Sequence, residues 1–176
     1  MMKKLTQEEM GRISIEEFKA MEKVPVVAVL DNVRSAGNVG AFFRTADAFC
    51  LQGVWLCGIC CCPPNNEIHK TALGAELTVD WRYFEHTLDA VKALQADGYT
   101  VYAIEQAHGS TMLSDLQLPQ NQKTAIIMGH EVFGVQQEVV DAANGCIEIP
   151  QYGTKHSLNV SVTAGIVMYQ LSNMLR

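Results

Sequence analysis

The stretch from Leu30 to Cys50 constrains the fold of this chain more than any other segment. It follows an apolar run at residues 26–30, which predicts a buried strand, and Gly37 and Gly40 then predict a turn with close backbone approach. After the turn, apolar or small side chains recur at helical spacing, namely Ala41, Phe42, Thr45, Ala46 and Phe49. The stretch therefore predicts a strand, a glycine turn and a helix. In open α/β sheets, a turn of this kind lies at the edge where ligands bind.

A basic residue, Arg44, lies within this largely apolar helix. A guanidinium stays ionised at any working pH, and its planar shape matches a phosphate group. The alternative is structural, because an arginine can pack its aliphatic stem on a helix while its charge reaches water. This stretch alone leaves both interpretations open.

Further apolar strands alternate with helical patterns over the rest of the chain. We expect strands at residues 54–57, 79–84, 99–104, 124–128 and 146–150, and helices at residues 86–96, 135–143 and from Val160 onward. Residues 107–122 are polar and rich in turn-forming residues. This alternation predicts an α/β fold, with a mostly parallel sheet flanked by helices.

The chain is expected to hold one domain, because 176 residues suffice for one full core but not for two. Residues 1–24 form a charge-balanced N-terminal arm, in which Ser14 and Glu17 predict a capped short helix. Residues 25–176 form the domain itself. No apolar run approaches the ~20 residues of a membrane span, and the first residues lack the apolar core of a secretory signal. We therefore expect a cytoplasmic protein without a membrane partner.

The formal net charge of −6 argues against binding to nucleic acid, because phosphate contacts normally come from a basic surface. A local basic patch remains compatible with this charge. The objection therefore lowers the expectation of an RNA partner without excluding it.

The cysteines raise the question of a metal site. Four of them are close in sequence, at Cys57, Cys60, Cys61 and Cys62. A zinc site usually takes its ligands from two separated pairs, whereas the only distant cysteine is Cys146. His69 is a conceivable fourth ligand, but nothing in the sequence fixes its geometry. We favour small apolar fillers beside a loop, and we expect no metal.

Polar residues follow several of the predicted strands. Glu105 follows Ile104, Glu131 lies between two glycines after residues 124–128, and Ser157 and Asn159 precede the last helix. This pattern alone predicts a small-molecule or nucleotide enzyme. A dinucleotide-dependent oxidoreductase is excluded, because residues 35–40 lack the first glycine of the G-x-G-x-x-G fingerprint.

Three segments, in order, resemble the signature motifs of one enzyme family. They are N-V-G-A-F-F-R-T-A at residues 38–46, I-I-M-G-H-E-V-F-G at residues 126–134 and I-P-Q-Y-G-T-K-H-S-L-N-V-S-V at residues 149–162. We call them motifs one, two and three. Together they resemble the SpoU (TrmH-like) branch of the SPOUT methyltransferases. The resemblance runs from about Val26 to the C-terminus.

This resemblance implies a fold, a reaction and a set of partners. The fold would be an α/β sheet whose C-terminal segment is threaded into a deep trefoil knot, so that residues 25–176 form a single SPOUT methyltransferase domain. The knotted loops would bind S-adenosylmethionine, and the chain would act as a homodimer. The reaction would be methyl transfer to a ribose 2′-hydroxyl of tRNA or rRNA.

The resemblance also assigns roles to individual residues. Arg44 matches the motif-one arginine that helps to activate the ribose hydroxyl, and Asn38 would hold its geometry. Glu131 matches the motif-two carboxylate, and Ser157 and Asn159 match the polar pair of motif three. The cofactor would lie against Ile104, Glu105, Gly129, Ile149 and Leu158.

Two further expectations concern activity and assembly. The alternative function is a knotted protein that binds cofactor or RNA but no longer methylates, acting as a regulatory or assembly subunit. The acidic composition favours this alternative, whereas the presence of the complete polar set argues against it. In the last helix, Val162, Ile166 and Tyr169 form a face too apolar for solvent, which predicts the dimer interface.

Overall fold

The computed structural model describes residues 1–11 and 13–176. Arg12, one of the basic residues of the charge-balanced arm, lies outside the described residues. Seven strands form one sheet, in which every pair of neighbouring strands is parallel. The prediction of a mostly parallel α/β sheet is therefore confirmed. The spatial order is β3 (Trp81–Phe84), β2 (Leu51–Cys57), β1 (Val24–Asp31), β6 (Thr124–Met128), β4 (Thr100–Ile104), β7 (Gly145–Glu148) and β5 (Thr111–Met112).

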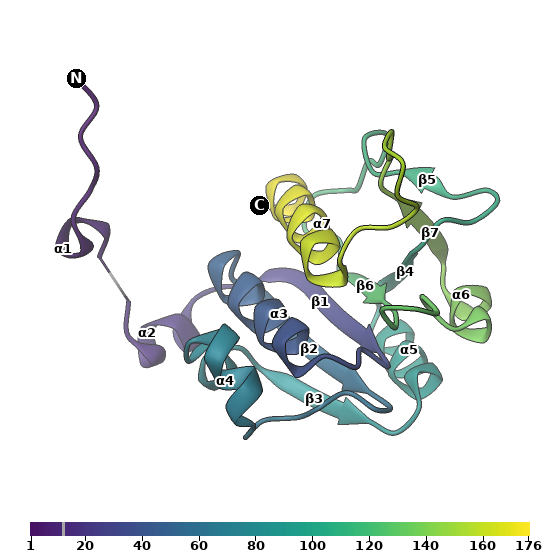
Figure 1. Ribbon diagram of the computed structural model, residues 1–176, viewed down its shortest axis with the longest axis horizontal. Coiled ribbons are helices and arrows are strands. Elements are labelled where there is room, and N and C mark those ends of the chain that lie inside the picture. Colours follow the sequence, from purple (N-terminus) through teal and green to yellow (C-terminus); the bar gives the residue numbers. More distant parts are fainter. Residues whose placement is uncertain (12) are drawn as a thin grey trace.

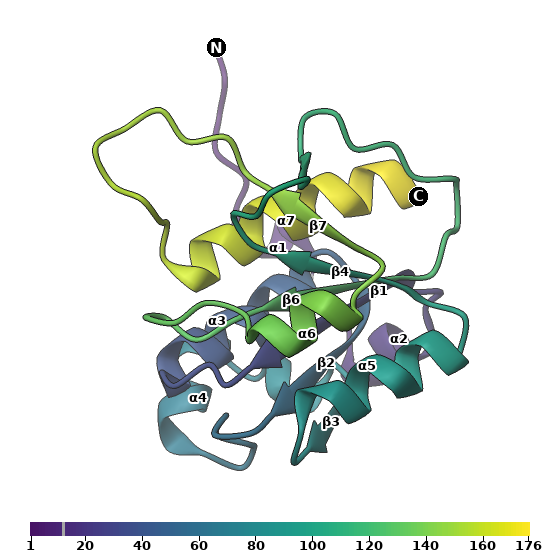
Figure 2. The same cartoon turned by 90° about the vertical axis from the view of Figure 1, so that its right-hand side faces the viewer.

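The central strands are apolar along their whole length because helices cover both faces of the sheet (Figures 1 and 2). On one face lie α3 (Ala36–Ala48), α4 (Asn66–Ala72), η1 (Ala75–Leu77) and α7 (Val160–Leu175), and on the other lie α5 (Thr87–Ala96) and α6 (Gln137–Ala142). Alternate residues of β1 serve the two cores. Leu30 packs with the α3 and α7 side, whereas Val29 packs with the α5 side.

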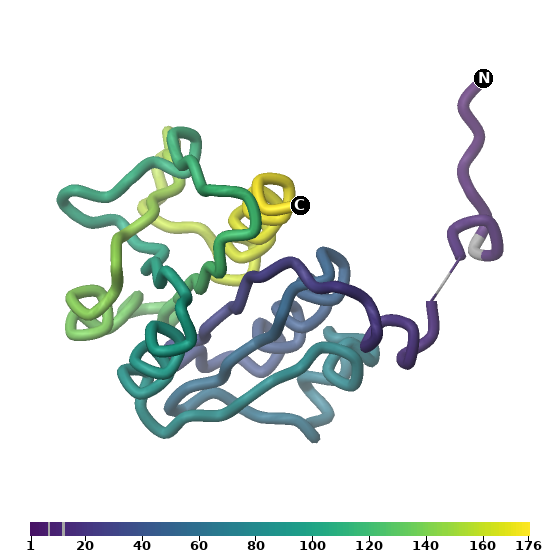
Figure 3. Tube along the Cα trace, turned by 180° about the vertical axis from the view of Figure 1, so that it is seen from behind, coloured from purple at the N-terminus to yellow at the C-terminus, as the bar shows by residue number. Residues whose placement is uncertain are grey.

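The N-terminal arm extends away from this sheet (Figures 1 and 3). It holds two short helices, α1 (Gln7–Met10) and α2 (Ile15–Ala20). The predicted capping box at the start of α2 is confirmed, since Ser14 Oγ accepts a hydrogen bond from the Glu17 amide at 3.1 Å. Phe18 of α2 is buried in the core and fixes the arm to the domain.

The predicted strands and helices are all present, with ends that differ by a few residues. The short helices α1 and η1 and one strand, β5, were not predicted. The strand has only two residues and lies within the polar stretch 107–122, where no hydrophobic period marks it. Within residues 1–11 and 13–176, no helix is long and apolar enough to cross a membrane.

Candidate active site

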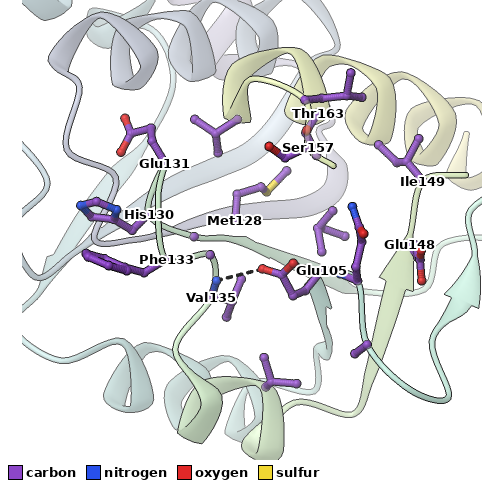
Figure 4. A pocket seen from close by; sticks show the side chains of 18 of the residues that line it. Glu105, Met128, His130, Glu131, Phe133, Val135, Glu148, Ile149, Ser157 and Thr163 are labelled. Atoms are coloured by element: carbon purple, nitrogen blue, oxygen red, sulfur yellow. Dashed lines mark hydrogen bonds between the residues drawn. The ribbon is translucent and has the colours of Figure 1, made fainter. Parts of the chain in front are cut away.

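A cleft of about 660 Å³ opens at the carboxyl ends of β6, β4 and β7, which are neighbours in the sheet. Its walls come from the segments that follow these strands and from the start of α7 (Figure 4). All five predicted cofactor residues line it, namely Ile104, Glu105, Gly129, Ile149 and Leu158. Of the predicted catalytic residues, Glu131, Ser157 and Asn159 line it as well.

The turn after β6 is folded back on itself beside this cleft. The amide of His130 donates to the Gly134 carbonyl at 3.0 Å, and the Gly134 amide donates to the His130 carbonyl at 2.9 Å. Gly129 is required here, because a Cβ at this position would collide with the backbone of Gly134 and Val135. We call residues 129–135 the motif-two turn.

Two carboxylates anchor the motif-two turn to other parts of the chain. Glu105 Oε2 accepts from the Val135 amide at 3.1 Å (Figure 4), and Glu105 Oε1 accepts from the Gln106 amide at 2.9 Å. Glu131 reaches in the other direction, toward motif one. Its Oε2 accepts from the Arg34 amide at 3.0 Å, and its Oε1 accepts from the Ser35 amide at 2.9 Å.

These contacts determine what Glu131 can do chemically. Partial burial acts to raise its pKa, but the amides of Arg34 and Ser35 and the side chain of Asn38 outweigh it and lower the pKa to about 2. A general base works best with a pKa near the operating pH. Glu131 therefore stays ionised at neutral pH and does not act as a group that takes up a proton. Its role is to hold two loops together through hydrogen bonds.

Asn38 and Asn159 complete the connection between the three motifs. Asn38 Nδ2 donates to Glu131 Oε1 at 2.9 Å, and Asn38 Oδ1 accepts from Asn159 Nδ2 at 3.4 Å. Asn159 is also the N-cap of α7, because its Oδ1 accepts from the amides of Ser161 and Val162. The structure thus brings Asn38, Glu131 and Asn159 together, although 121 residues separate the two asparagines.

Arg44 occupies a different position from the rest of the predicted set. Its side chain is exposed on α3, and neither Arg44 nor Asn38 lines the cleft. Within the described part of the chain, Arg44 makes no hydrogen bond and no ion pair with another side chain. Its guanidinium is therefore available to a group from outside the protomer.

One residue that supports the motif-two turn was not foreseen from the sequence. Asp31, the last residue of β1, is completely buried. Its carboxylate accepts hydrogen bonds from Thr87 Oγ1 at 2.6 Å, from Asn32 Nδ2 at 2.9 Å, and from both the amide and the side chain of Gln136, at 2.8 and 2.7 Å. Gln136 directly follows the motif-two turn. Asp31 therefore fixes the end of that turn to the central strand.

The cysteine cluster lies away from the cleft lining. Cys57 and Cys60 are buried among apolar side chains, as expected of fillers beside a loop. Burial raises the pKa of each of these two thiols to about 12. They are therefore protonated and unreactive at neutral pH.

The fold and the cleft together define a class of protein. It is a parallel α/β domain with a cleft outside the carboxyl ends of three adjacent strands, which is where domains of this class bind their ligands. Comparison with known sequences then shows the family: a sequence model of the SpoU rRNA methylase family matches residues 25–169. The chain belongs to this family, and the resemblance seen in the three motifs is confirmed.

Curated relatives cover nearly the whole chain. A tRNA (guanosine(18)-2′-O)-methyltransferase of Borreliella burgdorferi is 29% identical over 98% of this chain and 76% of its own length. The enzyme of the same name from Thermus thermophilus is 30% identical over 92% of this chain and 81% of its own length.

Solved structures agree in fold. An AdoMet-bound rRNA methyltransferase of Sinorhizobium meliloti has a TM-score of 0.81 and is 27% identical, covering 90% of this chain and 60% of that protein. A TrmH/SpoU tRNA-modifying enzyme of A. aeolicus has a TM-score of 0.80 at 23% identity, and it supports the fold alone. It covers 91% of this chain and 80% of the other.

Proposed function

We propose that this chain transfers a methyl group from S-adenosylmethionine to a ribose 2′-hydroxyl of tRNA or rRNA. The observation that carries the proposal is the connection of the three motifs beside one cleft, through Glu131, Asn38 and Asn159. The family and the names of the relatives support the same reaction. They do not favour the alternative of a protein that has lost its activity.

The cleft suits a cofactor of this size and chemistry. Its volume of about 660 Å³ lies within the ~300–1,000 Å³ of ordinary small-molecule sites. Apolar side chains such as Ile104, Ile149 and Leu158 offer surfaces for an adenine ring, and the strand ends offer backbone donors and acceptors. The cofactor supplies an electrophilic methyl group when bound. The chain's own residues must then place the ribose and assist the loss of its proton.

We assign these tasks to the predicted set. We call residues 32–35, between β1 and α3, the motif-one loop. Glu131 holds this loop and Asn38 against the motif-two turn, and Asn159 holds the start of α7 to Asn38. Ser157 lines the cleft at the entrance of α7 (Figure 4) and would bind ligand there. Arg44 would bind the phosphate next to the target ribose and favour the deprotonated hydroxyl.

We also propose a division of the chain and a topology. Residues 25–176 would form the methyltransferase domain, with residues 1–24 as a separate arm. The segment between β7 and α7 would pass through a deep trefoil knot, as the family resemblance implies. The return of α7 to the face covered by α3 supports a path in which the C-terminal segment crosses back over the sheet (Figure 1). Because tRNA and rRNA are cytoplasmic, we expect the protein there too.

The purified protein should bind S-adenosylmethionine without an added metal, because the described residues include no group of three or more His, Cys, Asp or Glu side chains that could hold a metal ion. Isothermal titration calorimetry with and without a chelator would measure this. Equal affinity in both conditions is expected. Absence of binding, or binding that the chelator abolishes, would contradict the assignment of the cleft.

The protein should also be a dimer at micromolar concentration. On α7, Val162, Ile166 and Tyr169 are 52%, 40% and 56% exposed in the single chain, and a stable interface would cover such a face. Light scattering should give a particle of twice 19.4 kDa, and Ile166→Asp should shift it toward the single chain. A wild-type particle of 19.4 kDa at every concentration would refute the dimer.

A further inference from the structure

We infer that Phe133, supported by His130, is a stacking platform for a base of the RNA substrate beside the target ribose. The inference rests on the proposed function, and it gives a role to a residue that lies in motif two but to which the resemblance assigns none. Phe133 lies at the tip of the motif-two turn and is 83% exposed, and its neighbour Val132 is exposed as well. Neither side chain contributes to the core, so folding does not explain two adjacent apolar residues here.

The phenyl ring lies on a turn that hydrogen bonds close. The two backbone hydrogen bonds between His130 and Gly134 close the turn, and His130 Nδ1 accepts from the Val132 amide at 3.0 Å. The ring centroids of His130 and Phe133 lie 4.9 Å apart, with an interplanar angle of 32°. A side chain that already packs against a neighbouring ring loses less conformational entropy when a ligand covers it.

The phenyl ring lies beside the region that we assign to the RNA substrate. Figure 4 shows His130 and Phe133 together at one side of the cleft, across from Glu148 and Ile149. Glu131, in the same turn, holds the motif-one loop that precedes the Arg44 helix. The phenyl face therefore lies at the mouth between the cofactor cleft and the segment that we assign to the ribose and its phosphate.

The chemistry of the partner follows from charge and geometry. A chain with a formal charge of −6 gains less from phosphate contacts than a basic RNA-binding protein does. Stacking on an aromatic side chain depends little on charge, and unpaired RNA bases are commonly recognised in this way. Stacking on Phe133 would therefore supply part of the RNA affinity that an acidic protein does not gain from phosphate contacts. The ligand of Phe133 would be an unstacked base of single-stranded RNA.

The test is binding of a short single-stranded oligoadenylate, with its abasic counterpart as competitor, measured by fluorescence anisotropy. Phe133→Ala should weaken binding about 5- to 100-fold, the range of one lost aromatic–base stack. Phe133→Trp should restore binding, and the indole emission should change when the oligonucleotide is added. Phe133→Leu keeps an apolar side chain without a π-face, so it should remain close to the alanine variant. Tyr83→Ala, which removes an exposed aromatic ring on β3, the edge strand farthest from β7 and β5, is the matched control and should bind as wild type does.

Any of three results would contradict the stacking role of Phe133. They are equal affinity of the wild-type protein for the oligonucleotide and its abasic form, binding by the Phe133→Ala protein as tight as that of wild type, and restoration of the full affinity by Phe133→Leu. Loss of the dimer in Phe133→Ala, seen by light scattering, would instead assign the ring to contact with a second copy and also overturn the inference. Methyl transfer by the wild-type protein is measured separately. Its failure would refute the proposed function, whereas transfer without an effect at Phe133 would refute the platform alone.

Discussion

Replacing Arg44 with alanine should lower the rate of methyl transfer by ~10²–10⁴-fold, the usual contribution of a group that assists proton transfer. Arg44 is exposed on α3, and its guanidinium makes no hydrogen bond or ion pair with another described side chain, so its removal should leave the fold intact. Cofactor affinity should change little, because Arg44 does not line the cleft. Arg44→Lys keeps the charge but loses the planar fork, and we expect it to restore little activity.

The measurement is single-turnover methyl transfer to RNA from a strain that lacks the gene, accompanied by a thermal melt. Lys92→Ala is a suitable control, because it removes one exposed positive charge from α5, on the opposite face of the sheet. An Arg44→Ala protein that melts normally and methylates at the wild-type rate would remove Arg44 from the mechanism and leave only a surface role.

Replacing Asp31 with alanine should lower the free energy of unfolding by about 3–5 kcal/mol, because the buried hydroxyl of Thr87 and the partly buried donors of Asn32 and Gln136 all lose their acceptor. For a chain of this size the melting temperature should fall by about 6–20 °C. Asp80→Ala, at an exposed carboxylate before β3, should have little effect on the melt.

The Asp31→Asn variant distinguishes an effect of Asp31 on protein stability from an effect on the position of the motif-two turn. An amide whose oxygen takes the place of Oδ1 can still accept from Thr87 and Asn32, but its nitrogen then faces the amide of Gln136. We expect a smaller loss of stability than with alanine and a clear loss of cofactor affinity by calorimetry. An asparagine variant that binds S-adenosylmethionine as tightly as wild type would show that Asp31 serves stability only.

The sequence predicted the strands well because most of them are buried on both faces. A strand such as β6, with all five residues buried, leaves a continuous apolar run that can be recognised without any partner. The order of the strands left no such signal. The neighbours β1 and β6 are separated by about half of the chain, and β5 joins the edge of the sheet with only two residues.

The sequence identified most residues of the site but not the hydrogen bonds between them. Motif resemblance selected Glu131 and Asn38, but only the placement of β1 beside β6 explains why a carboxylate in one loop meets amides in the other. Asp31 was missed because a single acid after a strand is a common sequence feature. Its donors, Thr87 and Gln136, lie 56 and 105 residues further along the chain.

The proposed reaction is tested most directly by methyl transfer from labelled S-adenosylmethionine to RNA of a strain that lacks the gene, followed by mapping of the modified nucleotide. Wild-type protein, without added metal, should restore a 2′-O-methyl group at a defined position of tRNA or rRNA. The Arg44→Ala protein should restore it far more slowly. Protein that binds the cofactor but transfers no methyl group to any RNA, or that methylates a base instead of the ribose, would contradict the proposed reaction.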